Sequence, residues 1–159
     1  MHIERHRWTY RNKVFAGLLV SAIALAACAT ASSNVTAANK KLAVDFFTLL
    51  LIDKQPQAAF DKYASQNYIQ HNPVADDGQA PAIKFLSDWF AANPRSIIEI
   101  KRVIAAGDLV AIHHHMRTSP EARGSAAVDI FRVDNGKIVE HWDVVQPIPE
   151  KSANKHPMF

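Results

Sequence analysis

An aspartate within an apolar segment is the sharpest chemical signal in the sequence. Asp129 stands in the run Ala-Val-Asp-Ile-Phe, which has the composition of a β-strand, where aspartate is depleted. Apolar surroundings would strip water from the carboxylate and raise its pKa toward the range useful for proton transfer. The alternative is a structural pair with Arg117, Arg132 or a histidine. We favour a functional acid/base group.

Three consecutive histidines, His113, His114 and His115, follow a Gly-Asp turn signal. Because side chains alternate along a strand, His113 and His115 share one face and His114 takes the other. The odd-numbered positions are the more polar, so we expect His113 and His115 to line a cavity and His114 to face the core. For each histidine the alternative is an exposed or hydrogen-bonded strand residue without a chemical role.

A third polar group lies near the end of the last apolar segment, at Glu140-His141-Trp142-Asp143. Alternation places His141 and Asp143 on one face and Glu140 and Trp142 on the other. A histidine and an aspartate across a pocket from Asp129 would form a proton-transfer group. Trp142 by itself is more typical of a core residue, and Glu140 of a solvated one.

The segment Tyr68-Ile69-Gln70-His71-Asn72-Pro73 is too short and polar for a helix, and Asn-Pro marks a turn. We expect a polar loop, in which Tyr68 and His71 could close the mouth of a pocket.

A metal site is a weaker interpretation. Gly107 followed after five residues by His113-x-His115 matches the opening of the cupin metal motif, but Glu121 comes too late and no second motif follows. His113, His115 and His141 could still be three ligands if they converged. We favour a site without metal or other cofactor.

The elements that must position these residues form two groups. Apolar residues at helical spacing after Asn39, and two later amphipathic segments, predict three helices; four segments rich in Ile, Val and aromatic residues predict strands, the last two joined by an Asn-Gly hairpin turn. Helices followed by an antiparallel meander indicate an α+β domain with helices on one sheet face and a pocket between. The expected elements are a helix from Asn39, helices 56–64 and 81–92, and strands 96–105, 109–117, 126–133 and 137–146.

The first 27 residues have the pattern of a secretory signal: a basic start, fourteen uncharged residues over 14–27, and small residues before Cys28. Fourteen residues are short for a membrane-spanning helix. Leu25-Ala26-Ala27-Cys28 resembles a bacterial lipobox, so we expect a signal peptide over 1–27, a lipidated Cys28, a flexible tether over 28–39 and a domain over 40–159. The protein would then be an exported periplasmic or cell-envelope lipoprotein that meets the membrane only through its lipid; the alternative is plain secretion.

Composition bounds the function. The 159 residues suit one globular domain, with 48% hydrophobic and 21% charged residues. The leader carries the whole formal charge of +3, so we expect no nucleic-acid partner. A single cysteine excludes an internal disulfide.

Four stretches together resemble the SnoaL-like polyketide cyclase branch of the NTF2-like superfamily. The resemblance implies a cone-shaped α+β barrel with a deep pocket, which in some members catalyses intramolecular aldol condensation without a metal through an acidic residue. Asp129 matches that residue, and His71, His113 and His141 match pocket-facing positions. The family also implies a homodimer formed through the sheet. The stretches are 68–73, 107–113, 129–132 and 136–144.

We therefore expect an acid/base enzyme of the aldol-condensation, cyclase or isomerase type that acts on a small hydrophobic or carbonyl compound. Asp129 would take a proton next to the carbonyl, and His113 or His141 would donate a hydrogen bond to the enolate oxygen. The alternative is a non-catalytic domain that binds a small ligand at the cell envelope. The expected substrate-binding residues are Tyr68, His71, His115, Trp142 and Asp143.

Overall fold

The computed structural model describes residues 32–159, and the compact unit that carries the site is Thr36–Phe159. Residues 32–39, which are the described part of the tether predicted over 28–39, are helical. The predicted signal peptide and Cys28 lie outside the described residues. No helix of the described part is long and apolar enough to cross a membrane.

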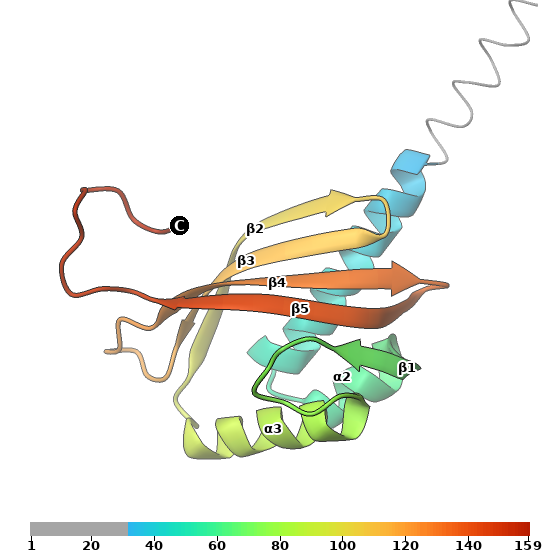
Figure 1. The fold of residues 1–159 in the computed structure, drawn as a ribbon, viewed down its shortest axis with the longest axis horizontal. Helices are drawn as coiled ribbons and strands as arrows, with labels where there is room; N and C mark the ends of the chain where they lie inside the picture. The colour runs from blue at the N-terminus through green and yellow to red at the C-terminus, as the bar shows by residue number, and fades with distance from the viewer. Residues whose placement is uncertain (1–31) are drawn as a thin grey trace, which may run out of the picture. The chain divides into compact units, whose positions relative to one another are not determined.

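Helical segments supply one layer of the domain (Figure 1). The N-terminal helix (32–47) runs directly into a π-helical turn, η1 (Thr48–Ile52). Helix α2 (Pro56–Tyr63) begins with a proline at a position where no backbone donor is needed. Helix α3 (Gln79–Ala92) ends at Asn93, before Pro94.

The second layer is a five-stranded sheet of order β1-β5-β4-β3-β2. Its antiparallel meander is formed by β2 (Ile97–Ala106), β3 (Leu109–Arg117), β4 (Ser125–Asp134) and β5 (Lys137–Pro147). The predicted hairpin joins β4 to β5, with Asn135 and Gly136 both at positive φ, as an Asn-Gly turn requires.

Strand β1 (Ala64–Gln70) corrects the sequence prediction, which made this segment part of a helix and a loop. It pairs in parallel with β5, with Ile69 opposite Glu140 and Gln70 opposite His141. The polar sequence has no strand periodicity of its own, so the pairing with β5 decides its conformation. Gln70 and Tyr68 are thereby fixed beside the last strand rather than in a free loop.

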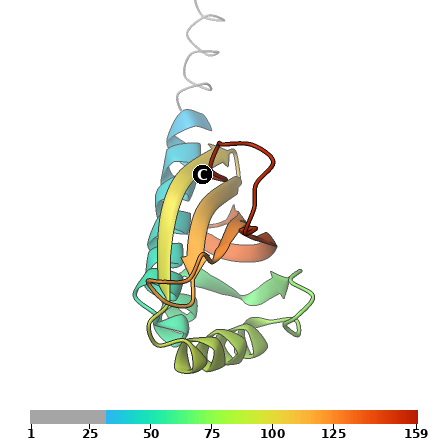
Figure 2. The ribbon, with the colours of Figure 1, turned by 90° about the vertical axis from the view of Figure 1, so that its left-hand side faces the viewer.

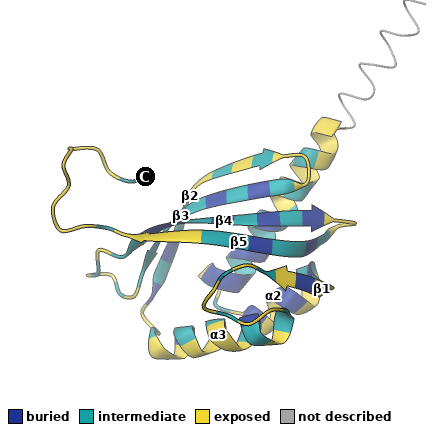
Figure 3. Cartoon of the chain, viewed as in Figure 1, coloured by how far each residue is buried: buried dark blue, intermediate teal, exposed yellow. Residues whose placement is uncertain are grey.

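The helices cover one face of the sheet, here called the inner face (Figure 2). Phe46 of the N-terminal helix packs edge-on against Phe60 and Phe131, each 5.5 Å between ring centroids. Buried residues alternate along β3 and β4 as one covered face demands (Figure 3). The predicted α+β class, with helices on a curved antiparallel sheet, is confirmed; the sheet is open, because its edge strands β1 and β2 do not pair with each other.

Candidate functional site

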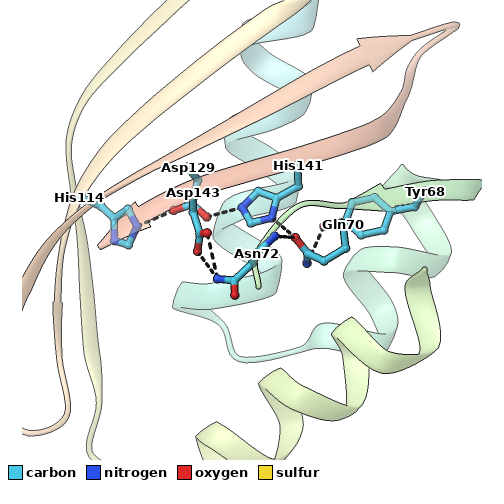
Figure 4. Close-up of polar contacts among 7 residues, drawn as sticks. All are labelled: Tyr68, Gln70, Asn72, His114, Asp129, His141 and Asp143. Carbon is cyan, nitrogen blue, oxygen red and sulfur yellow. Dashed lines mark hydrogen bonds and ion pairs between the residues drawn. The ribbon is translucent and has the colours of Figure 1, made fainter. Parts of the chain in front are cut away.

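A pocket of about 210 Å³ lies between the inner face of the sheet and the helices. Most of its wall is apolar, with Leu50, Leu51, Phe60, Leu86, Trp89 and Ile98 among the lining residues. At one end the lining is polar. This polar cluster, drawn in Figure 4, consists of Tyr68, Gln70, Asn72, His114, Asp129, His141 and Asp143.

Strand register brings the centre of the polar cluster together. Asp129 of β4 stands opposite Ile112 on β3 and opposite Asp143 on β5. His114 and His141 each lie two residues along from those partners, so both are diagonal neighbours of Asp129 on the inner face. Neighbouring strands thus place a histidine on each side of one carboxylate.

Each oxygen of Asp129 has its own imidazole partner (Figure 4). His114 Nε2 lies 2.5 Å from Oδ2, and His141 Nε2 lies 2.7 Å from Oδ1. All three side chains are buried. The arginines that the sequence offered as structural partners are not involved, and the partners are the histidines.

The bonding partners assign protons to the two histidines. The Nδ1 atom of His114 is buried and has no hydrogen-bond partner among the described residues. The hydrogen that His114 donates to Asp129 is therefore the one on Nε2, and a second hydrogen on Nδ1 would be buried without an acceptor. His141 Nδ1 lies 2.9 Å from Gln70 Oε1, which also accepts the backbone N–H of Asn72. His141 Nδ1 therefore carries a hydrogen, and one further proton is shared between His141 Nε2 and Asp129 Oδ1.

The pKa of the Asp129 carboxyl is lowered, whereas the sequence predicted that it would be raised. Burial raises this pKa, as the sequence suggested, but the hydrogen bonds from His114 and His141 outweigh burial and hold the pKa below the ordinary 3.8. Asp129 is therefore an anion at neutral pH, clamped between two donors. It can accept a proton without first losing one.

Strand β1 contributes a second row of polar groups. Gln70 Nε2 donates to the hydroxyl oxygen of Tyr68 over 3.2 Å, which leaves the Tyr68 O–H hydrogen without an acceptor among the described residues. Burial, the largest influence, raises the pKa of Tyr68 further above its usual value. Tyr68 is thus a permanently protonated hydroxyl that can donate into the pocket.

Asp143 lies beside Asp129 but is held differently. Asn72 Nδ2 donates to both Asp143 oxygens, at 2.9 and 2.7 Å. The Asn72 amide is itself oriented by the backbone N–H of Val74, which donates to its oxygen. Of the predicted site residues, the structure therefore brings Tyr68, Asp129, His141 and Asp143 to one pocket.

His113 and His115 are not part of the pocket, so the expected orientation of the triple-histidine strand is wrong. Both lie on the outer face of the sheet, where the rings contact Phe159 at centroid distances of 5.5 and 4.6 Å. His113 Nδ1 also contacts Arg102, and burial together with that guanidinium lowers the His113 pKa. The even-numbered His114, expected in the core, is the histidine that reaches Asp129.

His71 and Trp142 also lie outside the pocket lining, against expectation. Their rings stack at 4.8 Å on the outer side of the sheet, and His71 Nε2 bonds Glu140 over 2.8 Å. The residues that sequence reasoning missed are His114, Gln70 and Asn72. The last two belong to the polar segment already singled out, but only the pairing of β1 with β5 shows which members face the pocket.

The three histidines considered as metal ligands do not converge, because His113 and His115 lie on the opposite face from His141. Asp129, His141 and Asp143 do offer three ligand atoms within 4.8 Å of one another. Those atoms are occupied by hydrogen bonds inside the polar cluster. A metal ion would have to displace the proton between His141 and Asp129.

Several solved structures share the fold at low sequence identity. TsrD from Streptomyces laurentii aligns with a TM-score of 0.56 and 18% identity, over 69% of this chain and 88% of its own. An NTF2-like protein of unknown function from Mesorhizobium loti gives 0.58 and 18%, over 70% and 93%. A proposed SnoaL-like polyketide cyclase from Jannaschia sp. CCS1 gives 0.57 and 17%, over 70% and 87%. These likenesses show the NTF2-like fold.

A search of curated proteins found no match to the chain. The sequence profile of the SnoaL-like domain matches residues 43–141, a span that runs from the N-terminal helix to the histidine beside Asp129. The resemblance noted in the sequence is thereby confirmed, and the chain belongs to the SnoaL-like family.

Proposed function

We propose that the protein is an acid/base enzyme that removes a proton next to the carbonyl group of a small, largely apolar compound, as in an aldol-type cyclisation or an isomerisation. The observation that carries this proposal is the buried Asp129 carboxylate, held between two imidazoles at the polar end of an otherwise apolar pocket. The proposed polyketide cyclase among the structural neighbours supports it only by analogy.

In this proposal Asp129 takes the proton. The substrate C–H bond breaks and an O–H bond forms on the carboxylate. The C–H electron pair becomes the carbon–carbon double bond of the enolate, and the π pair of the carbonyl group moves onto its oxygen. Tyr68, whose O–H has no acceptor among the described residues, donates a hydrogen bond to that oxygen. The proton shared by His141 and Asp129 can then be returned to a different atom of the product.

Exchange of substrate protons with solvent tests the reaction without knowledge of the natural substrate. A panel of small ketones is incubated with the protein in heavy water, and loss of the protons next to the carbonyl is followed by NMR. We expect catalysed exchange for some ketones, reduced at least about a hundredfold by Asp129→Asn. The proposal is wrong if no ketone exchanges faster than in buffer, or if Asp129→Asn keeps the wild-type rate.

Two controls sharpen this experiment. Tyr68→Phe removes only the hydroxyl and should lower exchange by about a hundredfold while ketone binding persists. Asp88→Asn removes a carboxylate on the exposed side of α3, 67% exposed, and should leave the rate unchanged. Exchange should also persist in the presence of a chelator, and its loss there would favour a metal bound by Asp129, His141 and Asp143.

A second candidate function is ligand binding without catalysis. It is favoured by the completeness of the polar cluster, in which both oxygens of Asp129 and both of Asp143 already have internal donors. Native mass spectrometry would then show a retained and chemically unchanged ligand. Such a ligand, together with no proton exchange on the ketone panel, would establish binding in place of catalysis.

We also propose that the chain is exported and lipidated at Cys28, on the strength of the leader pattern and the lipobox-like sequence alone. An inhibitor of lipoprotein signal peptidase should leave a larger precursor in cells. An unchanged size would favour plain secretion.

A further inference from the structure

The charges around the pocket are one-sided. Two carboxylates, Asp129 and Asp143, line it, whereas none of the described side chains that line it is a lysine or an arginine. A hydrogen on His114 Nδ1 would have no acceptor among the described residues, and a single proton is shared between His141 and Asp129. With that hydrogen-bond assignment, the two carboxylates give the lining of the pocket a surplus of negative charge.

Asp143 is the origin of that surplus charge. Its oxygens accept from the uncharged amide of Asn72, while the proton on His141 offsets the charge of Asp129 alone. Asp143 stands directly opposite Asp129 in the β4–β5 register. In apolar surroundings, like charges at such close range repel far more strongly than in water.

The mouth of the pocket is apolar. Val74, Phe85 and Val145 all line the pocket and are nevertheless 66, 38 and 48% exposed. Apolar side chains left open to water at the rim of a small cavity offer a surface for the hydrocarbon part of a ligand whose polar end reaches the polar cluster.

From this arrangement we propose that the pocket selects uncharged carbonyl compounds with an apolar body and rejects anions such as carboxylates and phosphates, and that Asp143 is the residue that enforces the rejection. The carbonyl in this statement rests on the proposed function, but the exclusion of anions rests on the charges alone. An anionic ligand would bring a further negative charge to a site with no lysine or arginine among its described lining residues.

Matched probe pairs test the proposal. Benzylacetone and hydrocinnamate share the same phenyl body and differ in a methyl ketone against a carboxylate; cyclohexanone and cyclohexanecarboxylate form a smaller pair. Binding is measured at neutral pH by ligand-observed NMR and calorimetry. We expect the wild-type protein to bind each ketone at least about tenfold more tightly than its carboxylate.

Three variants separate charge from structure. Asp143→Asn should strengthen carboxylate binding at least about tenfold, and Asp143→Glu, which keeps the charge, should retain the discrimination. Asp88→Asn removes an exposed carboxylate of α3 and should change neither affinity. The proposal is overturned if the wild-type protein binds both members of each pair equally, or if it binds neither ketone. It is also overturned if Asp143→Asn discriminates between ketone and carboxylate as the wild type does.

The two proposals fail separately. Ketone binding with anion rejection but without proton exchange would refute the catalytic function and leave the selectivity standing. Proton exchange together with equal binding of carboxylates would refute only the selectivity.

Discussion

The two faces of the sheet carry similar acidic and histidine residues, but the partners of the carboxylates differ between the faces. On the inner face, the hydrogen-bond partners of Asp129 and Asp143 among the described residues are two histidines and the amide of Asn72. On the outer face, Glu140 meets the guanidinium of Arg132 at 2.8 Å as well as His71 at 2.8 Å. Because side chains alternate along β4 and β5, Asp129 and Asp143 point to one face of the sheet and Glu140 and Arg132 to the other.

The outer cluster, consisting of His71, Arg132, Glu140 and Trp142, is an ordinary surface network. Arg132 also pairs with Asp108 and lies over the Trp142 ring at 5.5 Å. Arg132, and to a lesser degree His71, lowers the pKa of the Glu140 carboxyl. Because water reaches the partners, these charges are screened and contribute little stability. The comparison shows that the inner-face aspartates differ from Glu140 in having no arginine partner among the described residues.

The largest expected difference between the faces is in stability. Asp129→Ala leaves two buried imidazoles without their acceptor and should lower the unfolding free energy by about 3–5 kcal/mol. The matched outer-face change, Glu140→Ala, should cost about 1 kcal/mol or less. Denaturant unfolding of both variants measures the contrast. Equal losses would show that the inner cluster is not a buried unit.

An intermediate effect is expected in the pH dependence of stability. Burial raises the pKa of Asp129, but its two histidine donors lower it more, so the folded value lies below the ordinary 3.8. The unfolded chain then binds the proton more readily, and the resulting stabilisation is complete above pH 3.8 and lost as the pH falls below it.

We therefore expect the wild-type unfolding free energy to fall more steeply than that of Asp129→Asn between about pH 5 and pH 2. Glu140→Gln should flatten the curve less, because the Glu140 carboxyl lies nearer to water. Parallel curves for wild type and Asp129→Asn, measured by denaturant unfolding at each pH, would contradict the inner-face assignment.

The smallest expected effect concerns the outer side of β3. Phe159 contacts the rings of His113 and His115, and the Lys101 ammonium lies 5.4 Å from its ring centroid. Phe159→Ala should cost about 1 kcal/mol of stability and leave ketone binding unchanged. Thermal unfolding and the ketone probe measure the two quantities. A loss of binding would mean that the outer face communicates with the pocket.

The local sequence pattern was sufficient to predict the strands and the hairpin turn of the antiparallel meander. The expected strand 109–117 and the Asn135-Gly136 turn are found where predicted, because strand composition and positive-φ turn chemistry act over a few residues. Asp129 was singled out correctly as a buried acid on the same kind of evidence. The strand β1 was missed, because Gln70 and its neighbours owe their strand conformation to pairing with a segment about seventy residues away.

By itself, then, the sequence determined the α+β class, the alternation of side chains along each strand, and the presence of an acid and several histidines in apolar surroundings. Only the tertiary structure decided which face of each strand is covered. That choice placed His114 rather than His113 beside Asp129 and turned His71 and Trp142 outward. It also reversed the expected pKa shift of Asp129, since burial can be read from neighbouring residues, whereas two hydrogen-bond donors arriving from other strands cannot.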